Sequence, residues 1–272
     1  MSQPVNPLSA SEPWNLVADG YAETTMLVFQ LFAEEAIAAS KLKPGAVVLD
    51  VACGPGTLAL KLARRANEVH GIDFSDAMLA IFKTKTEQAG YRNIILHCGD
   101  AQALPYADAT FDAAFSLFGL MFFPDRKMGF AEIYRTLKPG GSVAVTSWAP
   151  VDQSPAMQTM FGALRAIKPD LPPPQRSVTT LENPDLFKQE MRDAGFRDVE
   201  IRSITKPFPV TTIPEFWDSM VKGSAPIQMM KKNLGETLWR EKEKLALDYL
   251  NESLPALPTE LTSDAWLGVG VK

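Results

Sequence analysis

A short apolar strand followed by a glycine-rich turn is the feature that most constrains how this chain can fold. Residues 46–51 form an apolar run whose length and valines favour a buried strand. Gly54 and Gly56 then allow a tight turn, and a helix is predicted over 57–66. The first N–H groups of a helix lack partners within it, so this turn suits a nucleotide or an amino-acid carboxylate. A strand, a glycine turn and a helix in this order typically open a doubly wound α/β sheet.

The alternation of strand and helix continues along the next hundred residues. Apolar runs predict further strands over 68–72, 93–97, 111–116 and 142–148. Helices are predicted over 75–89, with Ser75 as the N-cap, and over 125–137, ending before Lys138-Pro139-Gly140-Gly141. Strands that alternate with helices indicate right-handed βαβ crossovers and a mainly parallel sheet.

The pattern changes after Trp148, where a proline-rich surface loop is predicted over 169–174. The expected elements beyond it are a helix over 183–194, a strand over 198–205, helical pieces over 211–254 and a last strand over 265–272. The first forty residues also read as helical, and 272 residues allow one large domain or two small ones. We therefore expect a single domain, 1–272. Its core spans about 41–150, 183–210 and 263–272, and a helical cap comes from 1–40, 151–182 and 211–262.

Composition disfavours several classes of protein. The 27 basic and 32 acidic residues give a net charge of −5 and a pI near 5.2, which argues against a nucleic-acid partner. No run approaches the ~18 apolar residues of a membrane span, and residues 1–16 do not resemble a signal peptide. Cys53 and Cys98 form neither a disulfide framework nor a metal-ligand set. We expect a cytoplasmic protein without a metal and without stable membrane insertion.

Three aspartates narrow the choice of ligand for the glycine turn. Asp73 follows the second predicted strand, where a carboxylate can accept hydrogen bonds from ribose hydroxyls. Asp50 places a charge inside an apolar strand, which is costly unless it organises the turn and indirectly holds an ammonium group. Asp100 follows the third strand and can accept from an adenine amino group. A ligand with adenine, ribose and amino-acid parts would match all three.

Four segments of the chain resemble one known family in order and in spacing. They are VLDVACGPGT (48–57), GIDFSDAML (71–79), GDAQALPYADATFDAAFSLFGLMFFPD (99–125) and EIYRTLKPGGSVAVTSW (132–148). The chain thus resembles class I S-adenosylmethionine-dependent methyltransferases, specifically the ubiquinone/menaquinone-type group, over about 44–148 and more weakly over 196–205. The resemblance implies a Rossmann-like, doubly wound seven-stranded sheet with an antiparallel last strand and helices on both faces. It also implies S-adenosyl-L-methionine as cofactor and S-adenosyl-L-homocysteine as product.

The resemblance also assigns cofactor-binding residues. It implies that Asp73 binds the ribose, Phe74 packs on the adenine, and Asp100 meets the adenine edge. Tyr21, in an N-terminal lid, would reach the carboxylate of the methionine moiety. The full expected set is Tyr21, Asp50, Ala52, Cys53, Gly54, Gly56, Asp73, Phe74, Met78, Gly99, Asp100, Ala101, Ser116, Leu117 and Phe118.

The acceptor is expected to be a small, partly apolar molecule. Methyl transfer is an in-line displacement for which the protein supplies alignment and desolvation, so a strong base is optional. His70 and His97 are accordingly interpreted as structural, and no catalytic residue is assigned. The helical pieces over 211–262 either cover the core or form a lid that admits an apolar acceptor. The expected acceptor-binding residues are Trp14, Met121, Phe122, Trp148 and Trp217.

Two other functions are compatible with the same sequence. A nicotinamide-dependent oxidoreductase would use the loose pattern Gly54-x-Gly56-x-x-Ala59, Asp73 and the pair Tyr134-x-x-x-Lys138. The pair lies just before Pro139, however, inside a segment that matches the methyltransferases. A relative that binds S-adenosylmethionine without transferring methyl would carry the same cofactor motifs. Oligomeric state and the methylated atom are not readable from the sequence.

Overall fold

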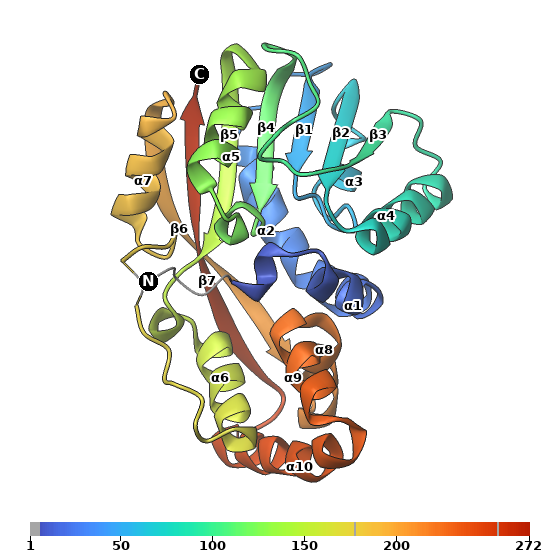
Figure 1. Cartoon of the computed structure of the whole chain (residues 1–272), viewed down its shortest axis with the longest axis vertical. Helices are drawn as coiled ribbons and strands as arrows, with labels where there is room; N and C mark the ends of the chain where they lie inside the picture. The colour runs from blue at the N-terminus through green and yellow to red at the C-terminus, as the bar shows by residue number, and fades with distance from the viewer. Residues whose placement is uncertain (1–5, 177, 255) are drawn as a thin grey trace.

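A seven-stranded sheet forms the centre of the computed structural model, which describes residues 6–176, 178–254 and 256–272 (Figure 1). The strand order is β3-β2-β1-β4-β5-β7-β6. The first five strands in this order pair in parallel, and β7 runs antiparallel to both β5 and β6. The predicted doubly wound sheet with an antiparallel last strand is therefore confirmed. The strands are β1 (Val47–Val51), β2 (Glu68–Asp73), β3 (Ile94–Cys98), β4 (Phe111–Leu117), β5 (Leu137–Trp148), β6 (Arg197–Val210) and β7 (Thr259–Val271).

Helices cover both faces of the sheet because successive strand residues point to opposite sides. Val48 packs with the side chains of α2 (Met26–Ala39), α3 (Ala59–Leu62) and α4 (Asp76–Gln88). Its neighbour Leu49 packs in a separate cluster with α5 (Arg126–Thr136) and α7 (Pro184–Asp193). Each face thus has its own apolar core.

A helical cap lies at the far ends of β6 and β7, which run well beyond the rest of the sheet (Figure 1). These two strands stay paired out to Val210 and Thr259, so they are longer than the sequence predicted. The cap helices are α6 (Pro155–Ile167), α8 (Ile213–Gly223), α9 (Ala225–Leu234) and α10 (Glu236–Ser253). They share an apolar cluster built around Trp217 and Trp239. The N-terminal segments η1 (Pro7–Ser9) and α1 (Glu12–Gly20) lie between cap and sheet, while residues 1–5 of the expected cap are outside the described residues.

Three further elements also differ from the prediction. The helix expected over 57–66 is regular only over α3, because Arg65 and Ala66 both donate to the Leu62 carbonyl in tight turns that lead into β2. Strand β5 begins at Leu137, since a register shift beside Phe111 accommodates the proline and glycines that follow. The N-terminal helix contains a π-helical turn, η2 (Tyr21–Thr25), between α1 and α2.

No helix among the described residues is both long enough and apolar enough to cross a membrane.

Candidate functional site

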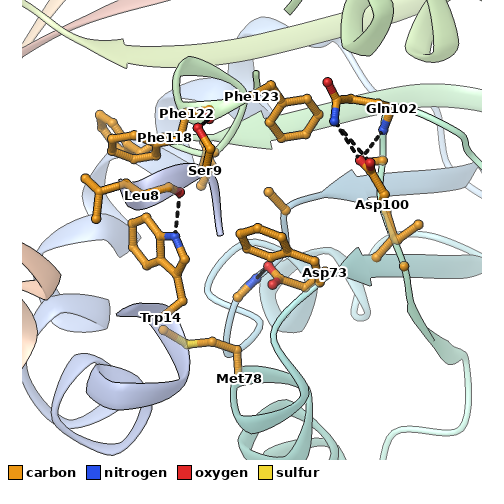
Figure 2. Close-up of a pocket in the computed structure, with 18 of the residues that line it drawn as sticks. Leu8, Ser9, Trp14, Asp73, Met78, Asp100, Gln102, Phe118, Phe122 and Phe123 are labelled. Carbon is orange, nitrogen blue, oxygen red and sulfur yellow. Dashed lines mark hydrogen bonds between the residues drawn. The ribbon is translucent and has the colours of Figure 1, made fainter. Parts of the chain in front are cut away.

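The first cavity lies where β1, β2 and β4 end, beneath the N-terminal segment (Figure 2). Ligands of open α/β sheets bind at the carboxyl ends of the strands, so this is the expected place for a site. Its volume is about 230 Å³. It is lined by Leu8, Ser9, Trp14, Tyr21, Ala52, Gly54, Ile72, Asp73, Phe74, Met78, Gly99, Asp100, Ala101, Gln102, Leu117, Phe118, Gly119, Phe122, Phe123 and Pro124.

Asp73 lies at the middle of this cavity, at the end of β2 (Figure 2). Its Oδ2 accepts from the Gly54 N–H at 2.8 Å, and its Oδ1 accepts from the Ser75 N–H at 2.9 Å. Burial raises the pKa of Asp73, although these backbone donors act in the opposite direction. Each carboxylate oxygen keeps a further acceptor position, so Asp73 can receive two ligand hydroxyls.

The loops that form the cavity floor approach each other closely. Ala52 has a φ of 54° and Gly54 a φ of 52°, both in the left-handed region that favours glycine. A Cβ at Gly119 would come within 2.3 Å of the Ala52 Cβ. Gly119 was missed in the sequence analysis, although a glycine directly after Leu117-Phe118 at a strand end could have indicated this contact.

Four of the expected cofactor-binding residues lie beneath the cavity and do not line it. Gly56 packs under the loop, where a Cβ would come within 2.3 Å of the Phe82 ring. Cys53 is buried next to Gly71, and burial raises the pKa of its thiol. The buried Ser116 hydroxyl accepts from the Leu120 N–H at 3.2 Å. These three residues, and the fourth, Asp50, support the loops that line the cavity.

Asp50 is a buried carboxylate whose Oδ2 has no hydrogen-bond partner among the described residues. Burial raises its pKa to about 8, and the nearby Asp73 adds to the rise, while the Ala59 N–H opposes it. Near neutral pH the folded protein therefore keeps a proton on Asp50 that the unfolded chain would release. A buried carboxyl group in this state responds strongly to any positive charge brought near it.

This raised pKa predicts that the folded state becomes less stable as pH increases. The folded pKa of about 8 lies above the ordinary value of 3.8, so stability is lost between these two pH values as the unfolded chain ionises first. We expect Asp50→Asn to reduce this loss, measured by urea unfolding at pH 5 and pH 8. The matched control, Asp19→Asn on the exposed face of α1, should retain the wild-type slope. An unchanged slope in Asp50→Asn would contradict the assignment.

The two ends of the first cavity differ in chemistry (Figure 2). At one end Asp100 accepts from the Gln102 N–H at 2.8 Å, and Phe74 exposes about a third of its surface, 37%. At the other end Trp14 and Phe118 present aromatic surfaces. Gln102 was missed in the sequence analysis, despite its position directly after Asp100-Ala101. A ligand with a hydrogen-bonding base and a less polar reactive end matches this polarity.

The N-terminal segment closes the cavity through specific hydrogen bonds. The Ser9 hydroxyl donates to the Phe122 carbonyl at 2.8 Å, and the Trp14 indole donates to the Leu8 carbonyl at 3.0 Å (Figure 2). The Ser75 hydroxyl, in the N-cap of α4, donates to the Asn15 side chain at 2.6 Å. Leu8 and Ser9 had no distinguishing signal in the sequence. The lid is thus attached to both walls of the cavity.

Tyr21 lies at the π-helical turn and lines the cavity with an unpartnered hydroxyl, as far as the described residues show. Burial, and then the Asp73 carboxylate, raise the pKa of Tyr21, so the hydroxyl stays protonated and can act as a donor. Its ring packs edge-on against Trp14 and Phe29, with centroids 6.5 Å and 5.7 Å away. Tyr21 can therefore donate a hydrogen bond to a ligand but is not suited to be a base.

A second, larger cavity of about 900 Å³ lies between the sheet and the cap. Four of the five expected acceptor-binding residues line it, namely Trp14, Met121, Phe122 and Trp148. Many of its other lining residues are flexible or aromatic apolar side chains that the sequence analysis did not assign to a site: Phe29, Met157, Met160, Phe161, Leu164, Phe208, Met220, Met229, Met230 and Leu234. Methionine side chains adapt to irregular apolar shapes, so this cavity suits an apolar molecule.

The two cavities share one wall. Leu8, Trp14, Tyr21, Phe118 and Phe122 line both of them. These residues come from the N-terminal segment and from the loop after β4, two segments that are far apart in the sequence. A group bound in one cavity would face a group bound in the other across this wall.

Trp217 and the two histidines do not line either cavity. Trp217 is buried in the cap, where its ring stacks on Trp239 at 6.1 Å and its indole N–H donates to Glu243 at 2.8 Å. His70 pairs with Glu68 at 2.6 Å, and His97 packs beside Tyr106. Trp217 therefore contributes to the packing of the cap, and the two histidines lie on strands of the sheet.

Comparison with known proteins identifies the family. The chain is 31% identical, over 186 residues, to a demethylmenaquinone methyltransferase of Geobacillus sp. (strain WCH70), covering 63% of this chain and 80% of that protein. The chain belongs to the class I S-adenosylmethionine-dependent methyltransferases of the ubiquinone/menaquinone type. A family described as "Methyltransferase domain" matches residues 48–141. The UbiE C-methyltransferase of Geotalea daltonii is 30% identical over 185 residues, or 61% of this chain and 76% of that protein.

Solved structures agree with the fold of this methyltransferase. YcgJ of Bacillus subtilis superposes with a TM-score of 0.58 at 20% identity, covering 88% of this chain and 97% of that chain. A phosphoethanolamine N-methyltransferase of Haemonchus contortus, solved with S-adenosylhomocysteine, gives 0.57 at 18% identity over 95% and 59% of the two chains. The enzyme uses S-adenosylmethionine and transfers methyl to a small-molecule acceptor. These comparisons do not favour the nicotinamide-dependent oxidoreductase or a relative without methyl transfer.

Proposed function

We propose that the first cavity binds S-adenosylmethionine and that the second cavity binds an apolar acceptor. The observation that carries this proposal is the wall shared by the two cavities, because it is where donor and acceptor would meet. In-line displacement requires the two reactants to approach along one axis, and two cavities that share lining residues would bring their ligands next to each other. The sheet and the cap would act as one domain, since β6 and β7 run through both.

Three features of the first cavity fit the cofactor. Asp73 would accept the ribose hydroxyls with the acceptor positions that its backbone donors leave free. Gly54 lines the cavity, and a Cβ there would meet no protein atom within 4 Å, so the loop leaves room for a ligand. The unpartnered Oδ2 of Asp50 lies below the loop, where a bound ammonium group would favour the ionised form of this carboxyl group. Phe74, Asp100 and Ala101 would surround the adenine.

The other residues that line the first cavity would align the cofactor and exclude water. When bound, the cofactor supplies a methyl group already activated on a positively charged sulfur. The Tyr21 hydroxyl would donate a hydrogen bond to the cofactor carboxylate, and the nearby rings of Phe118 and Trp14 favour a positive charge. The lid residues Leu8 and Ser9 close the cavity, so water is kept away from the reacting atoms.

The acceptor is proposed to be an apolar molecule with a flat reactive part. Phe29, Phe118 and Trp148 pack together next to the shared wall and present ring faces and edges to the second cavity. The methionines of the cap line the part of the cavity formed by α6, α8 and α9. The names of two relatives, a demethylmenaquinone methyltransferase and a ubiquinone/menaquinone C-methyltransferase, make a reduced demethylmenaquinone the first acceptor to test.

The test is methyl transfer from S-adenosylmethionine labelled in its methyl group. The purified protein would be incubated with reduced demethylmenaquinone in detergent, and label would be measured in the organic extract. A labelled quinol supports the proposed acceptor class. Label that reaches only other small molecules would retain the two-cavity proposal and exclude this acceptor. Calorimetry that detects no binding of S-adenosylmethionine would overturn the proposed role of the first cavity.

Filling the second cavity should separate acceptor binding from cofactor binding. We expect Met229→Trp, on the cavity side of α9, to raise the KM for the acceptor about tenfold because the larger ring occupies acceptor space, with an unchanged Kd for S-adenosylmethionine. The matched control is Lys232→Trp on the same helix, because Lys232 is exposed and does not line the cavity. Equal KM values for the two variants would show that the acceptor binds elsewhere.

A further inference from the structure

The loop after β4 divides the two cavities, and its backbone is strained at one residue. Phe118 lines both cavities and has a φ of 54°. This left-handed conformation is unfavourable for a bulky side chain and persists only where the surroundings hold it. Phe118 is also buried, with 5% of its surface exposed, so its conformation is set by neighbours in the protein.

Two buried hydroxyl groups hold this loop. Thr146 on β5 accepts the Phe118 N–H with its Oγ1 at 3.0 Å, and Ser116 on β4 accepts the Leu120 N–H at 3.2 Å. Both residues are fully buried. The Phe118 ring then stacks on Trp148, with centroids 4.1 Å apart and planes at 26°, and lies 4.7 Å from the ring of Phe29.

We propose that Thr146 is a positioning residue for methyl transfer, because its hydroxyl holds Phe118 in the strained conformation that keeps the ring in the wall beside which donor and acceptor would meet. The proposal rests on the proposed function of the two cavities. Without this hydrogen bond the Phe118 N–H would be buried and unpaired. Rotation of the backbone back to a negative φ would relieve both costs and would move the ring out of the shared wall.

Valine and serine substitutions at residue 146 test this role. Thr146→Val keeps the shape and removes the acceptor, whereas Thr146→Ser keeps the hydroxyl. Two probes are titrated by calorimetry: S-adenosylhomocysteine, which would reach the Phe118 end of the cavity, and adenosine, which would occupy only the end near Asp73 and Asp100. We expect Thr146→Val to bind S-adenosylhomocysteine about tenfold more weakly, with adenosine unchanged and with rescue in Thr146→Ser.

A glycine at residue 118 supplies the decisive comparison. Glycine adopts a φ of 54° without strain and has no ring to position, so the Thr146 hydroxyl should no longer affect ligand binding in Phe118→Gly. The valine substitution should therefore add no further loss of S-adenosylhomocysteine binding in that background, as in a double-mutant cycle. If Thr146→Val alone proves too unstable to titrate, Thr146→Ala takes its place in the cycle, because it also removes the hydroxyl acceptor.

The outcomes separate this proposal from the function on which it rests. Wild-type affinity for S-adenosylhomocysteine in Thr146→Val would overturn the role of Thr146, as would an equal loss of adenosine binding. An equally large effect of the valine in the Phe118→Gly background would also overturn it. If wild-type protein binds neither probe, the proposed function of the first cavity fails instead.

Discussion

Asp73→Ala is expected to weaken S-adenosylmethionine binding at least about a hundredfold, the largest effect of any single side chain in the first cavity. Hydrogen bonds to a charged group contribute about 1.5–3 kcal/mol each, and Asp73 would receive two from the ribose. The same substitution removes the acceptor of the Gly54 N–H, which lies 2.8 Å from the carboxylate, so the glycine turn also loses its anchor. Isothermal titration calorimetry with the cofactor measures the effect directly.

Asp76→Asn is the matched control for this substitution. Asp76 lies three residues further on, in the first turn of α4, and does not line the first cavity. The control should bind the cofactor like the wild type. Similar affinities for Asp73→Ala and Asp76→Asn would remove Asp73 from the site and with it the proposed orientation of the ribose.

The two glycines of the turn are expected to respond to alanine to different degrees. Gly56 has a φ of 89°, and a Cβ there would come within 2.3 Å of the buried Phe82 ring. Backbone strain and overpacking together predict that Gly56→Ala loses about 3–5 kcal/mol of unfolding free energy. Gly54 has a comparable φ of 52° but open space around it, so Gly54→Ala should lose only about 1–2 kcal/mol.

We also expect the two glycine variants to differ in their affinity for the cofactor. Gly54 lines the cavity, so its added methyl group would occupy ligand space and weaken cofactor binding about tenfold in a protein that remains folded. Urea unfolding and calorimetry on both variants test this. Equal losses of stability in the two variants would contradict the packing of Gly56 against Phe82. Unchanged affinity in Gly54→Ala would show that the cofactor does not approach the turn.

The fold was predictable because its signals are local in the sequence. The valines of β1 and the alternation of strand and helix up to Trp148 predicted the parallel sheet, and the structure confirms it. The Ser75 N-cap was also predicted, and its hydroxyl accepts the Met78 N–H at 3.2 Å. The lengths of β6 and β7 were underestimated, since their outer halves are stabilised by pairing with each other and not by a continuous apolar pattern.

Most of the site residues that were predicted lie at or soon after the end of a strand; Trp14, Tyr21 and Met78 are exceptions, which the family resemblance indicated. Asp73 is the last residue of β2, and Asp100 and Phe118 follow shortly after β3 and β4; strand ends meet at one edge of a parallel sheet. Gly56 follows β1, and Ser116 lies next to the end of β4, yet the structure places both below the cavity. Whether a loop residue faces a ligand or supports its neighbour depends on backbone conformation, which a sequence motif does not specify.

The sequence by itself determined the succession of strands and helices along the chain, the position of the glycine turn and the family to which this methyltransferase belongs. All three depend on patterns within short segments, where neighbouring residues decide the outcome. Only the tertiary structure decided that Tyr21 and Phe118 share one wall, that Trp217 packs inside the cap, and that a second cavity opens beside the first. These features arise from contacts between separate segments of the chain, so their geometry is set by how the lid, sheet and cap pack together.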